Sequence, residues 1–499
     1  MNNQLISIHF WFGDHPSARI LDMEVIAGGY LNPAEPTVVY CDGILPTCTI
    51  NENGARTICN ACIARTRYNF SLLNIAHRMV PLSEFIDRSK RTTILNSLPN
   101  DVAPAVLNQL SDPFEGIGRG ALSSAISFTR DMNLVDDDTV ALARKLLATS
   151  LIISDAVTCA LRNFNPQSVV VHNGRLAEYH AVYQTCRHSG VDTYTHEVCS
   201  PEVGWYLFRN GRVHDRESFA ELIRFSTLEV PLERLESVSK AYLSNKRIGT
   251  VEFENYTKQQ KLGNRSYTID DRQQVIAVFT SSEDEFASIG PEWAMPFFES
   301  QHSAIKQIVN ECHAHDPSIL FVVRMHPNMA RMHRDDLEPY RDLVGQNVHV
   351  VDPESSVDSY SVLDDADIVL TFGSTIGCEA TYWGKPVVQV GHSLFEHLDV
   401  CYIPKSQHEI VRWLLSPPPP KAKSNVYPYI YTICVGGYKY LHVDLESSPP
   451  KYCNVDMMIP SFGAYDKFLG LLRHNWWSRF VYSIRLAVLC RINLIVKVW

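Results

Sequence analysis

Three short apolar runs in the second half of the chain constrain its fold more than any other feature. They are Ile319–Met325, Asp367–Thr371 and Pro386–Val390, and they are rich in Val, Ile and Leu. Each is too short for a buried helix, and such runs are typical of strands covered on both faces of a parallel sheet. A segment of helical character separates the second run from the third, so the sequence predicts a βαβ unit of an α/β protein.

The turn inside this unit is Gly373-Ser374-Thr375. A helix that begins at Ser374 and Thr375 presents free backbone N–H groups and the positive end of its dipole, which favours phosphate binding. Gly373 lets the backbone approach a ligand, and the two hydroxyls can add hydrogen bonds. Glu379, about one turn into the helix, suits the hydroxyls of a ribose. An N-cap role for Ser374 and a solvated Glu379 remain the alternative.

A second polar loop follows the first apolar run. Its sequence is Arg324-Met325-His326-Pro327. In open α/β sheets, ligands bind at loops that follow the carboxyl ends of strands. We expect His326 to donate a hydrogen bond to a phosphate oxygen and Arg324 to supply charge. Pro327 ends the strand and fixes the turn.

Three motifs therefore occur together in this half: Arg324-x-His326-Pro327, Ser374-Thr375 followed by Glu379, and Gly384-Lys385-Pro386-Val387-Val388. Together they resemble the donor half of GT-B glycosyltransferases of bacterial surface polysaccharides, especially capsule polysaccharide biosynthesis proteins. The His-Pro pair is also similar to that of sialyl- and Kdo-transferases and of teichoic acid polymerases. The match is good from about Gln274 to Leu415 and looser in the N-terminal half.

This resemblance implies an α/β fold of two Rossmann-like domains that face a cleft. We expect an N-terminal acceptor-side domain at residues 1–262 and a nucleotide-sugar-binding domain at 263–416. Residues 417–499 would hold a proline linker, a segment returning to the first domain and a basic aromatic tail. In the family, the His-Pro and Ser-Thr motifs hold the donor nucleotide and its phosphates, and no catalytic metal or other cofactor is required.

Polar residues also follow the strands expected in the first half. A loop after the strand Leu5–Phe12 contains His15, and Glu24 lies in the helix-like segment behind it. His15 is a candidate catalytic residue, although Gly, Asp, Pro and Ser around it also suit an ordinary turn. Glu24 is a candidate on the acceptor side.

Two later strands, Ser168–Val171 and Val191–Thr195, end in Asn173 with Arg175 and in Glu197 respectively. Asn173 and Arg175 are expected on the acceptor side. Glu197 is the preferred general base, since an inverting transfer needs a carboxylate or imidazole near the acceptor hydroxyl. A structural, hydrogen-bonded Glu197 is the alternative.

Four cysteines follow the second strand, Thr37–Tyr40, with the spacing C-x6-C-x10-C-x2-C. They are Cys41, Cys48, Cys59 and Cys62. Four thiolates can hold a tetrahedral structural zinc ion, but only the last pair has the usual ligand spacing. Reduced, partly buried thiols are the alternative.

Composition limits the cellular setting and the partners. The formal net charge of −10 argues against general nucleic-acid binding. The start of the chain lacks the basic residues of a signal peptide, so we expect a cytoplasmic protein. The last stretch, Arg473–Trp499, is basic and aromatic and contains no Asp or Glu. Such a segment favours the inner face of a membrane, with docking on the protein itself as the alternative.

The sequence therefore predicts a glycosyltransferase that moves a sugar from a CMP- or UDP-linked donor to a surface or capsule glycan, which can be lipid-linked. Inversion is expected from the resemblance. Two other hypotheses remain open. One is a polyol-phosphate transferase of the teichoic type with a CDP-linked donor, and the other is a catalytically degenerate GT-B scaffold.

Overall fold

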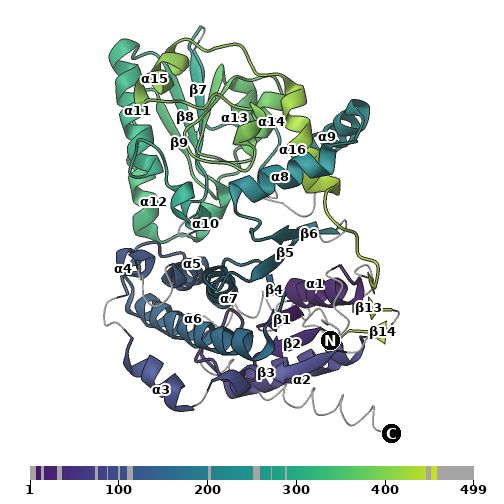
Figure 1. Ribbon diagram of the computed structural model, residues 1–499. Helices are drawn as coiled ribbons and strands as arrows, with labels where there is room; N and C mark the ends of the chain where they lie inside the picture. Colours follow the sequence, from purple (N-terminus) through teal and green to yellow (C-terminus); the bar gives the residue numbers. More distant parts are fainter. Residues whose placement is uncertain are drawn as a thin grey trace. The chain divides into compact units, whose positions relative to one another are not determined.

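The computed structural model describes residues 7–12, 16–30, 36–73, 77–86, 88–98, 102–109, 116–200, 204–250, 259–270, 272–286, 289–444, 451–453 and 455–457. The chain forms two compact units (Figure 1). The first contains residues 1–125, 133–213 and 437–499, and the second contains residues 126–132 and 214–436.

The first unit is built on a six-stranded sheet with the order β3-β2-β1-β4-β5-β6. Its strands are β1 (Ser7–Trp11), β2 (Thr37–Tyr40), β3 (Arg78–Pro81), β4 (Ser168–His172), β5 (Asp192–Ser200) and β6 (Gly204–Arg209). All pairs are parallel except β5 with β6. Every residue of β1 and β2 is buried, as expected for strands covered by helices on both faces.

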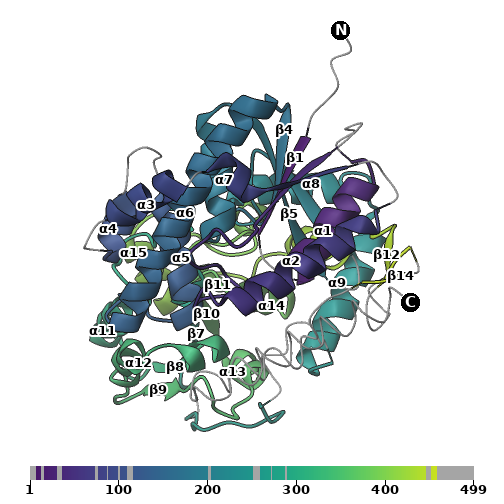
Figure 2. The same ribbon diagram turned by 90° about the horizontal axis from the view of Figure 1, so that it is seen from below.

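Seven α-helices lie wholly or mainly in the described part of this unit: α1 (Pro16–Ala27), α2 (Arg56–Ser71), α3 (Arg88–Asn96), α4 (Pro104–Gln109), α5 (Ile117–Thr129), α6 (Asp137–Phe164) and α7 (Ala177–His188). The 28-residue helix α6 packs along α7, as Figure 2 shows. It buries Ile153 and Val157 in the core that also contains Val169 of β4. Gly116 forms a turn just before α5, and Gly120 in the first turn of this helix lies against His180.

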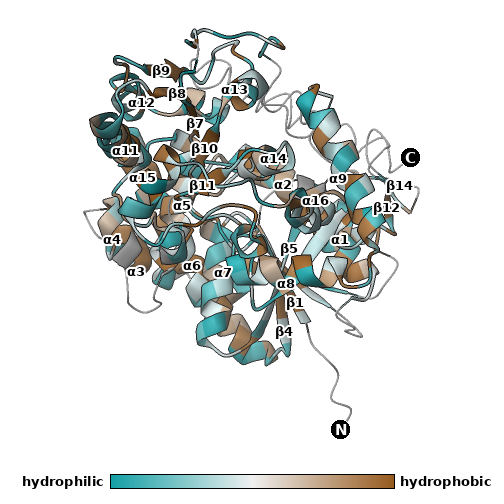
Figure 3. Ribbon diagram, turned by 90° about the horizontal axis from the view of Figure 1, so that it is seen from above, coloured by the Kyte–Doolittle hydropathy of each residue, from teal (hydrophilic) through white to brown (hydrophobic). Residues whose placement is uncertain are grey.

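The second unit contains a five-stranded, fully parallel sheet with the order β11-β10-β7-β8-β9. Its strands are β7 (Val275–Phe279), β8 (Leu320–Arg324), β9 (Val348–Val351), β10 (Ile368–Thr371) and β11 (Val387–Gln389). The three apolar runs of the sequence are therefore β8, β10 and β11. Figure 3 shows hydrophobic residues, coloured brown, in this sheet near the labels of β8 and β10.

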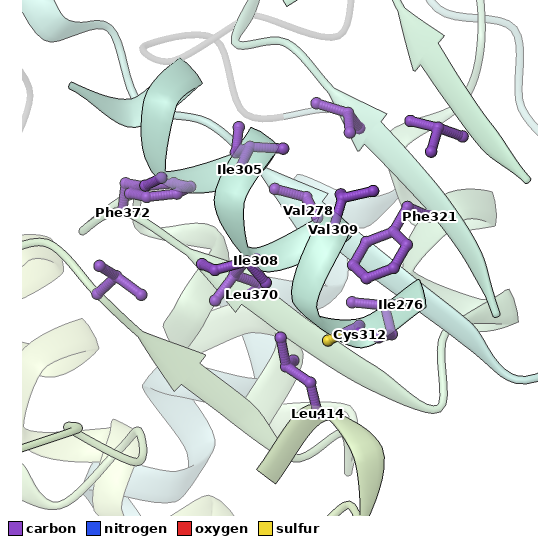
Figure 4. Close-up of a cluster of buried hydrophobic side chains, with 14 of the residues drawn as sticks. Ile276, Val278, Ile305, Ile308, Val309, Cys312, Phe321, Leu370, Phe372 and Leu414 are labelled. Atoms are coloured by element: carbon purple, nitrogen blue, oxygen red, sulfur yellow. The ribbon is translucent and has the colours of Figure 1, made fainter. Parts of the chain in front are cut away.

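Nine α-helices belong to the described part of this unit: α8 (Arg216–Thr227), α9 (Leu232–Arg247), α10 (Glu283–Phe286), α11 (Gln301–His315), α12 (Arg334–Arg341), α13 (Ser359–Asp365), α14 (Ile376–Tyr382), α15 (Gln407–Leu415) and α16 (Tyr427–Val435). Helix α11 buries Ile305 and Ile308 in a cluster with Ile276, Phe321 and Leu370 of three neighbouring strands (Figure 4). Both sheets thus confirm the predicted α/β class with two Rossmann-like units.

The boundary between the units differs from the expected one at residues 262 and 263. Helices α8 and α9 belong to the second unit because α16 packs against both of them (Figure 1). Residues 259–270, which contain the expected boundary, also pack within this unit. Arg265 donates to both carboxylate oxygens of Asp365 at 2.6 and 2.9 Å, and Lys261 N donates to Ser356 O at 2.9 Å.

The chain returns to the first unit at Gly437. Tyr438 and Trp205 exchange two backbone hydrogen bonds of 2.7 and 2.9 Å. The carboxylate of Glu24, on α1, then accepts the N–H groups of Leu441 and His442 at 2.8 and 3.0 Å. Strands β12 (Val443–Asp444), β13 (Lys451–Tyr452) and β14 (Val455–Asp456) follow. The basic tail at Arg473–Trp499 lies outside the described residues.

Within the described ranges, no helix is both long enough and apolar enough to cross a bilayer.

Glu24 should therefore anchor the return segment. Glu24→Ala removes the buried, charged acceptor of two backbone N–H groups, which should cost about 2–4 kcal/mol of unfolding free energy. Urea denaturation measures this loss, and hydrogen exchange at Leu441 and His442 localises it. Glu84→Ala, at an exposed position, is the control. Unchanged exchange at the two amides in the Glu24 variant would contradict the assignment.

Candidate functional site

The strand order of the second unit defines one place suited to a ligand. The chain runs from β7 through β8 to β9 and then crosses to the other side of β7 to form β10 and β11. The carboxyl ends of β7 and β10 are therefore a topological switch point, where open α/β sheets bind ligands. The loops after these two strands are in contact, since Ser281 Oγ donates to Phe372 O at 3.3 Å.

The loop after β10 contains the predicted turn. Gly373 has a φ of +101°, and a Cβ atom there would lie 1.9 Å from His392 O, so only glycine fits. The hydroxyls and backbone N–H groups of Ser374 and Thr375 have no hydrogen-bond partner among the residues that the structure describes, and both residues are half-buried. These donors are therefore available to an anion.

The loop after β8 orients His326. Its backbone N–H donates to Thr280 Oγ1 at 2.9 Å, which ties it to the loop after β7. The ring Nδ1 accepts the N–H of Asn328 at 3.2 Å, so the neutral ring carries its hydrogen on Nε2. Pro327 begins the short 3-10 helix Pro327–Arg331. His326 is thus prepared as a hydrogen-bond donor.

Arg324 is placed differently from the expectation. It is 2% exposed, and its Nη1 donates to Asp352 O at 2.5 Å while Nε lies 3.4 Å from Ser359 Oγ. Burial lowers the pKa of the guanidinium to about 10. Its Nη2 has no partner among the described residues, but so small an exposure leaves a ligand little access. Arg324 mainly joins β8 to the loop after β9.

Glu379 lies in α14 and is 4% exposed. It pairs with Lys246 Nζ of α9 at 3.1 Å and accepts a hydrogen bond from the hydroxyl of Tyr360. Burial, together with the charge of Glu379, raises the pKa of Tyr360, so the phenol stays a donor. The carboxylate is held in one orientation. No sequence pattern pointed to Lys246, because this residue lies far from Glu379 in the chain.

The first unit has its own switch point, between β1 and β4. The loop after β4 contains Asn173, in the left-handed conformation with a φ of 56°. Its side-chain amide donates to Glu197 Oε2 of β5, and Glu197 Oε1 accepts the N–H of Val198 at 2.9 Å. His172 Nε2 lies 3.9 Å from the same carboxylate, which is 21% exposed. The structure thus brings the predicted Asn173 and Glu197 together.

Arg175 takes part in the same loop. Its N–H donates to Asn173 Oδ1 at 3.0 Å, and its Nε donates to Ser123 Oγ at 2.8 Å. His196 of β5 and Asp22 of α1 form a buried pair that no sequence pattern predicted. Nε2 of His196 and Oδ1 of Asp22 are 3.0 Å apart.

Other predicted residues are not part of these clusters. Glu24 is fully buried and binds the return segment, so it does not serve as an acceptor-side residue. His15 lies outside the described residues. Among the described residues, no group of three or more His, Cys, Asp or Glu is arranged to hold a metal ion. The four cysteines considered as a possible zinc site do not form such a group, and burial raises the pKa of Cys41 to about 12.

The comparison with protein families finds a match inside the second unit. A family model described as UDP-N-acetylglucosamine 2-epimerase matches residues 297–410, which include the loops of His326 and Ser374. No curated protein sequence matches the chain.

Solved structures show similar but distant proteins. The β-Kdo 2,4-transferase KpsC of Thermosulfurimonas dismutans is 13% identical, with 54% of this chain and 80% of that chain covered and a TM-score of 0.35. The UDP-GlcNAc 2-epimerase of Neisseria meningitidis, bound to UDP-GlcNAc, is 14% identical, with 86% and 99% covered and a TM-score of 0.24. The chain is thus similar to Kdo transferases and to sugar-nucleotide epimerases.

The turn after β10 should not tolerate a side chain. Gly373→Ala places a Cβ against the backbone at a positive φ, which should cost about 2–4 kcal/mol of unfolding free energy and displace Ser374 and Thr375. Gly384→Ala is a matched control, because Gly384 also has a positive φ, +81°, but nothing within 4 Å of the added atom. The control should lose only about 1 kcal/mol in the same urea titration. Equal losses in both variants would refute the packing argument.

Proposed function

We propose that the chain is a glycosyltransferase that moves a sugar from a nucleotide-sugar donor to a surface or capsule glycan. The observation that carries the proposal is the set of unpartnered donors of Ser374 and Thr375 at the switch point, with the oriented His326 in the loop on the other side of β7. The same segment matches the model of a family named for a UDP-sugar. Hydrogen-bond donors at such a position suit the phosphates of a nucleotide.

In this proposal, the second unit binds the donor. Ser374, Thr375 and the Nε2–H of His326 hold the phosphates, and these donors stabilise the negative charge that develops on the leaving nucleotide. Glu379, fixed by Lys246 and Tyr360, accepts hydrogen bonds from the ribose hydroxyls. The proposed transfer needs no metal, since donors of the protein carry the charge.

The first unit supplies the base in the proposed reaction. Glu197 takes the proton of the acceptor hydroxyl as that oxygen attacks the anomeric carbon, with inversion. Asn173 and the N–H of Val198 hold one oxygen each, and His172 lies close to the carboxylate. We propose a CMP- or UDP-linked donor and a glycan or lipid-linked glycan acceptor. The basic C-terminal tail would bring the enzyme to the inner face of the membrane.

The family model favours a second candidate function, epimerisation of a nucleotide sugar. The same phosphate and ribose contacts would serve it. The two candidates differ in their products, because an epimerase converts the donor without an acceptor, whereas a transferase releases the nucleotide when an acceptor is present.

Nucleotide binding tests the shared part of both candidates. We expect one of CMP, CDP, UDP, UDP-GlcNAc and CMP-sialic acid to raise the melting temperature, since a ligand at 100 times its Kd stabilises the folded state by about 2.7 kcal/mol. Ser374→Ala and His326→Ala should each remove most of this shift. Ser237→Ala and His408→Ala, at exposed positions, should keep it. No shift with any nucleotide would count against the proposed function.

Product analysis then separates the candidates. The stabilising nucleotide sugar is incubated with the protein, with and without a glycan acceptor, and the products are resolved by chromatography. Acceptor-dependent release of nucleotide supports transfer, and an isomerised nucleotide sugar without acceptor supports epimerisation. Glu197→Gln should reduce transfer at least about 100-fold while nucleotide binding persists.

A further inference from the structure

The proposed phosphate site lacks the cation expected from the sequence. Arg324 is buried and donates to Asp352 O, so it offers a ligand little. Another arginine of the same unit, Arg216, lies at the start of α8, and its side chain is 25% exposed. Its position relative to the loop after β11 is fixed by shared packing. Phe219 of α8 and Phe395 both contact the ring of Tyr429, with centroids 6.2 and 5.1 Å apart.

Arg216 uses only one of its nitrogens in the described contacts. Nη1 donates to His392 Nδ1 at 2.8 Å and to the carboxylate of Glu396. Nε is buried and has no partner among the described residues, and no described contact uses Nη2. The Nε–Nη2 edge of a guanidinium is a planar fork that matches two oxygens of a phosphate. The side chain as a whole is partly exposed, and a phosphate at this edge would satisfy the buried Nε donor.

The residues held by Arg216 adjoin the turn of Ser374. The Cβ position of Gly373 is 1.9 Å from His392 O, and that of Gly391 is 2.4 Å from Phe372 O. The loops after β10 and β11 thus touch backbone to backbone. Ser393, 2% exposed, follows in the second loop, and its hydroxyl also has no partner among the described residues.

We propose that Arg216 binds a phosphate of the donor nucleotide through the Nε–Nη2 edge, with His392 and Glu396 as positioning residues that hold Nη1. This assignment rests on the proposed function, because it names a further residue of the same site. Glu396 has two effects in it. Its carboxylate orients the guanidinium, and its negative charge also opposes the incoming phosphate.

Calorimetric titration of the full-length protein tests the assignment. The titrants are the nucleotide that stabilises the protein, its nucleoside and inorganic pyrophosphate. Arg216→Gln should weaken nucleotide binding about 10- to 100-fold and leave nucleoside binding unchanged. Arg216→Lys keeps the positive charge but lacks the planar fork, so its nucleotide affinity should lie between those of the wild type and of Arg216→Gln. Glu396→Gln should tighten nucleotide binding roughly threefold, because it removes a like charge.

Arg412→Gln is the matched control, since Arg412 is exposed and pairs with Glu409 at 3.4 Å. Arg412→Gln should change neither the affinity for the nucleotide nor the affinity for the nucleoside. If the ion pair were purely structural, both the Arg216 and the Glu396 variant would bind the nucleotide more weakly. Opposite changes in nucleotide affinity therefore support the assignment.

The outcomes separate this assignment from the proposed function. Nucleotide affinity within twofold of wild type in Arg216→Gln, or an equal loss for nucleotide and nucleoside, would overturn the assignment alone. Binding of pyrophosphate through Arg216 without binding of any nucleotide would overturn the proposed function and keep the anion site. If the wild-type protein binds neither a nucleotide nor pyrophosphate, both the Arg216 assignment and the proposed function are overturned.

Discussion

The candidate site depends on a close contact between two loop backbones. Gly373 and Gly391 lie where any side chain would collide with the backbone of the other loop, at His392 O and Phe372 O. Because no side chain separates the loops, the donors of Ser374 are held directly beside the residues that Arg216 contacts. The parallel sheet supplies the rigid base for this contact, since β10 and β11 are adjacent in register.

Charge in the second unit is distributed according to burial. Arg324, nearly fully buried, is used inside the fold, and Glu379, also buried, is neutralised by Lys246. A buried ion costs free energy unless it is paired, so neither group can be left unpaired in an empty site. Arg216 and Glu396 are each 25% exposed, and partial hydration makes a change of partner far less costly there. A partly exposed ion pair is therefore the better place for a ligand's charge.

The sequence predicted the parts of the fold that local patterns determine. The runs of β7, β8, β10 and β11 are continuous and apolar, and Gly373 carries a backbone requirement of its own. Strands β3, β6 and β9 lacked such a pattern, because β3 contains Arg78 and Pro81 and β9 is only partly buried. The direction of Arg324, the pairing of Lys246 with Glu379 and the position of Arg216 depend on helices packed from distant sequence. No local pattern encodes such contacts, and the place of α8 and α9 in the second unit was missed for the same reason.

Under the proposed function, the two units use the same topology for opposite chemistry. Each sheet has a switch point, followed by a residue with positive φ, Asn173 in one and Gly373 in the other. The turn in the second unit presents hydrogen-bond donors, which suit an anion. The turn in the first unit is next to a carboxylate, Glu197, with His172 near it, which suits a hydroxyl that must lose its proton. Group transfer from a phosphate ester needs both kinds of group. Under the proposed function, each sheet supplies one of these two groups at its own switch point.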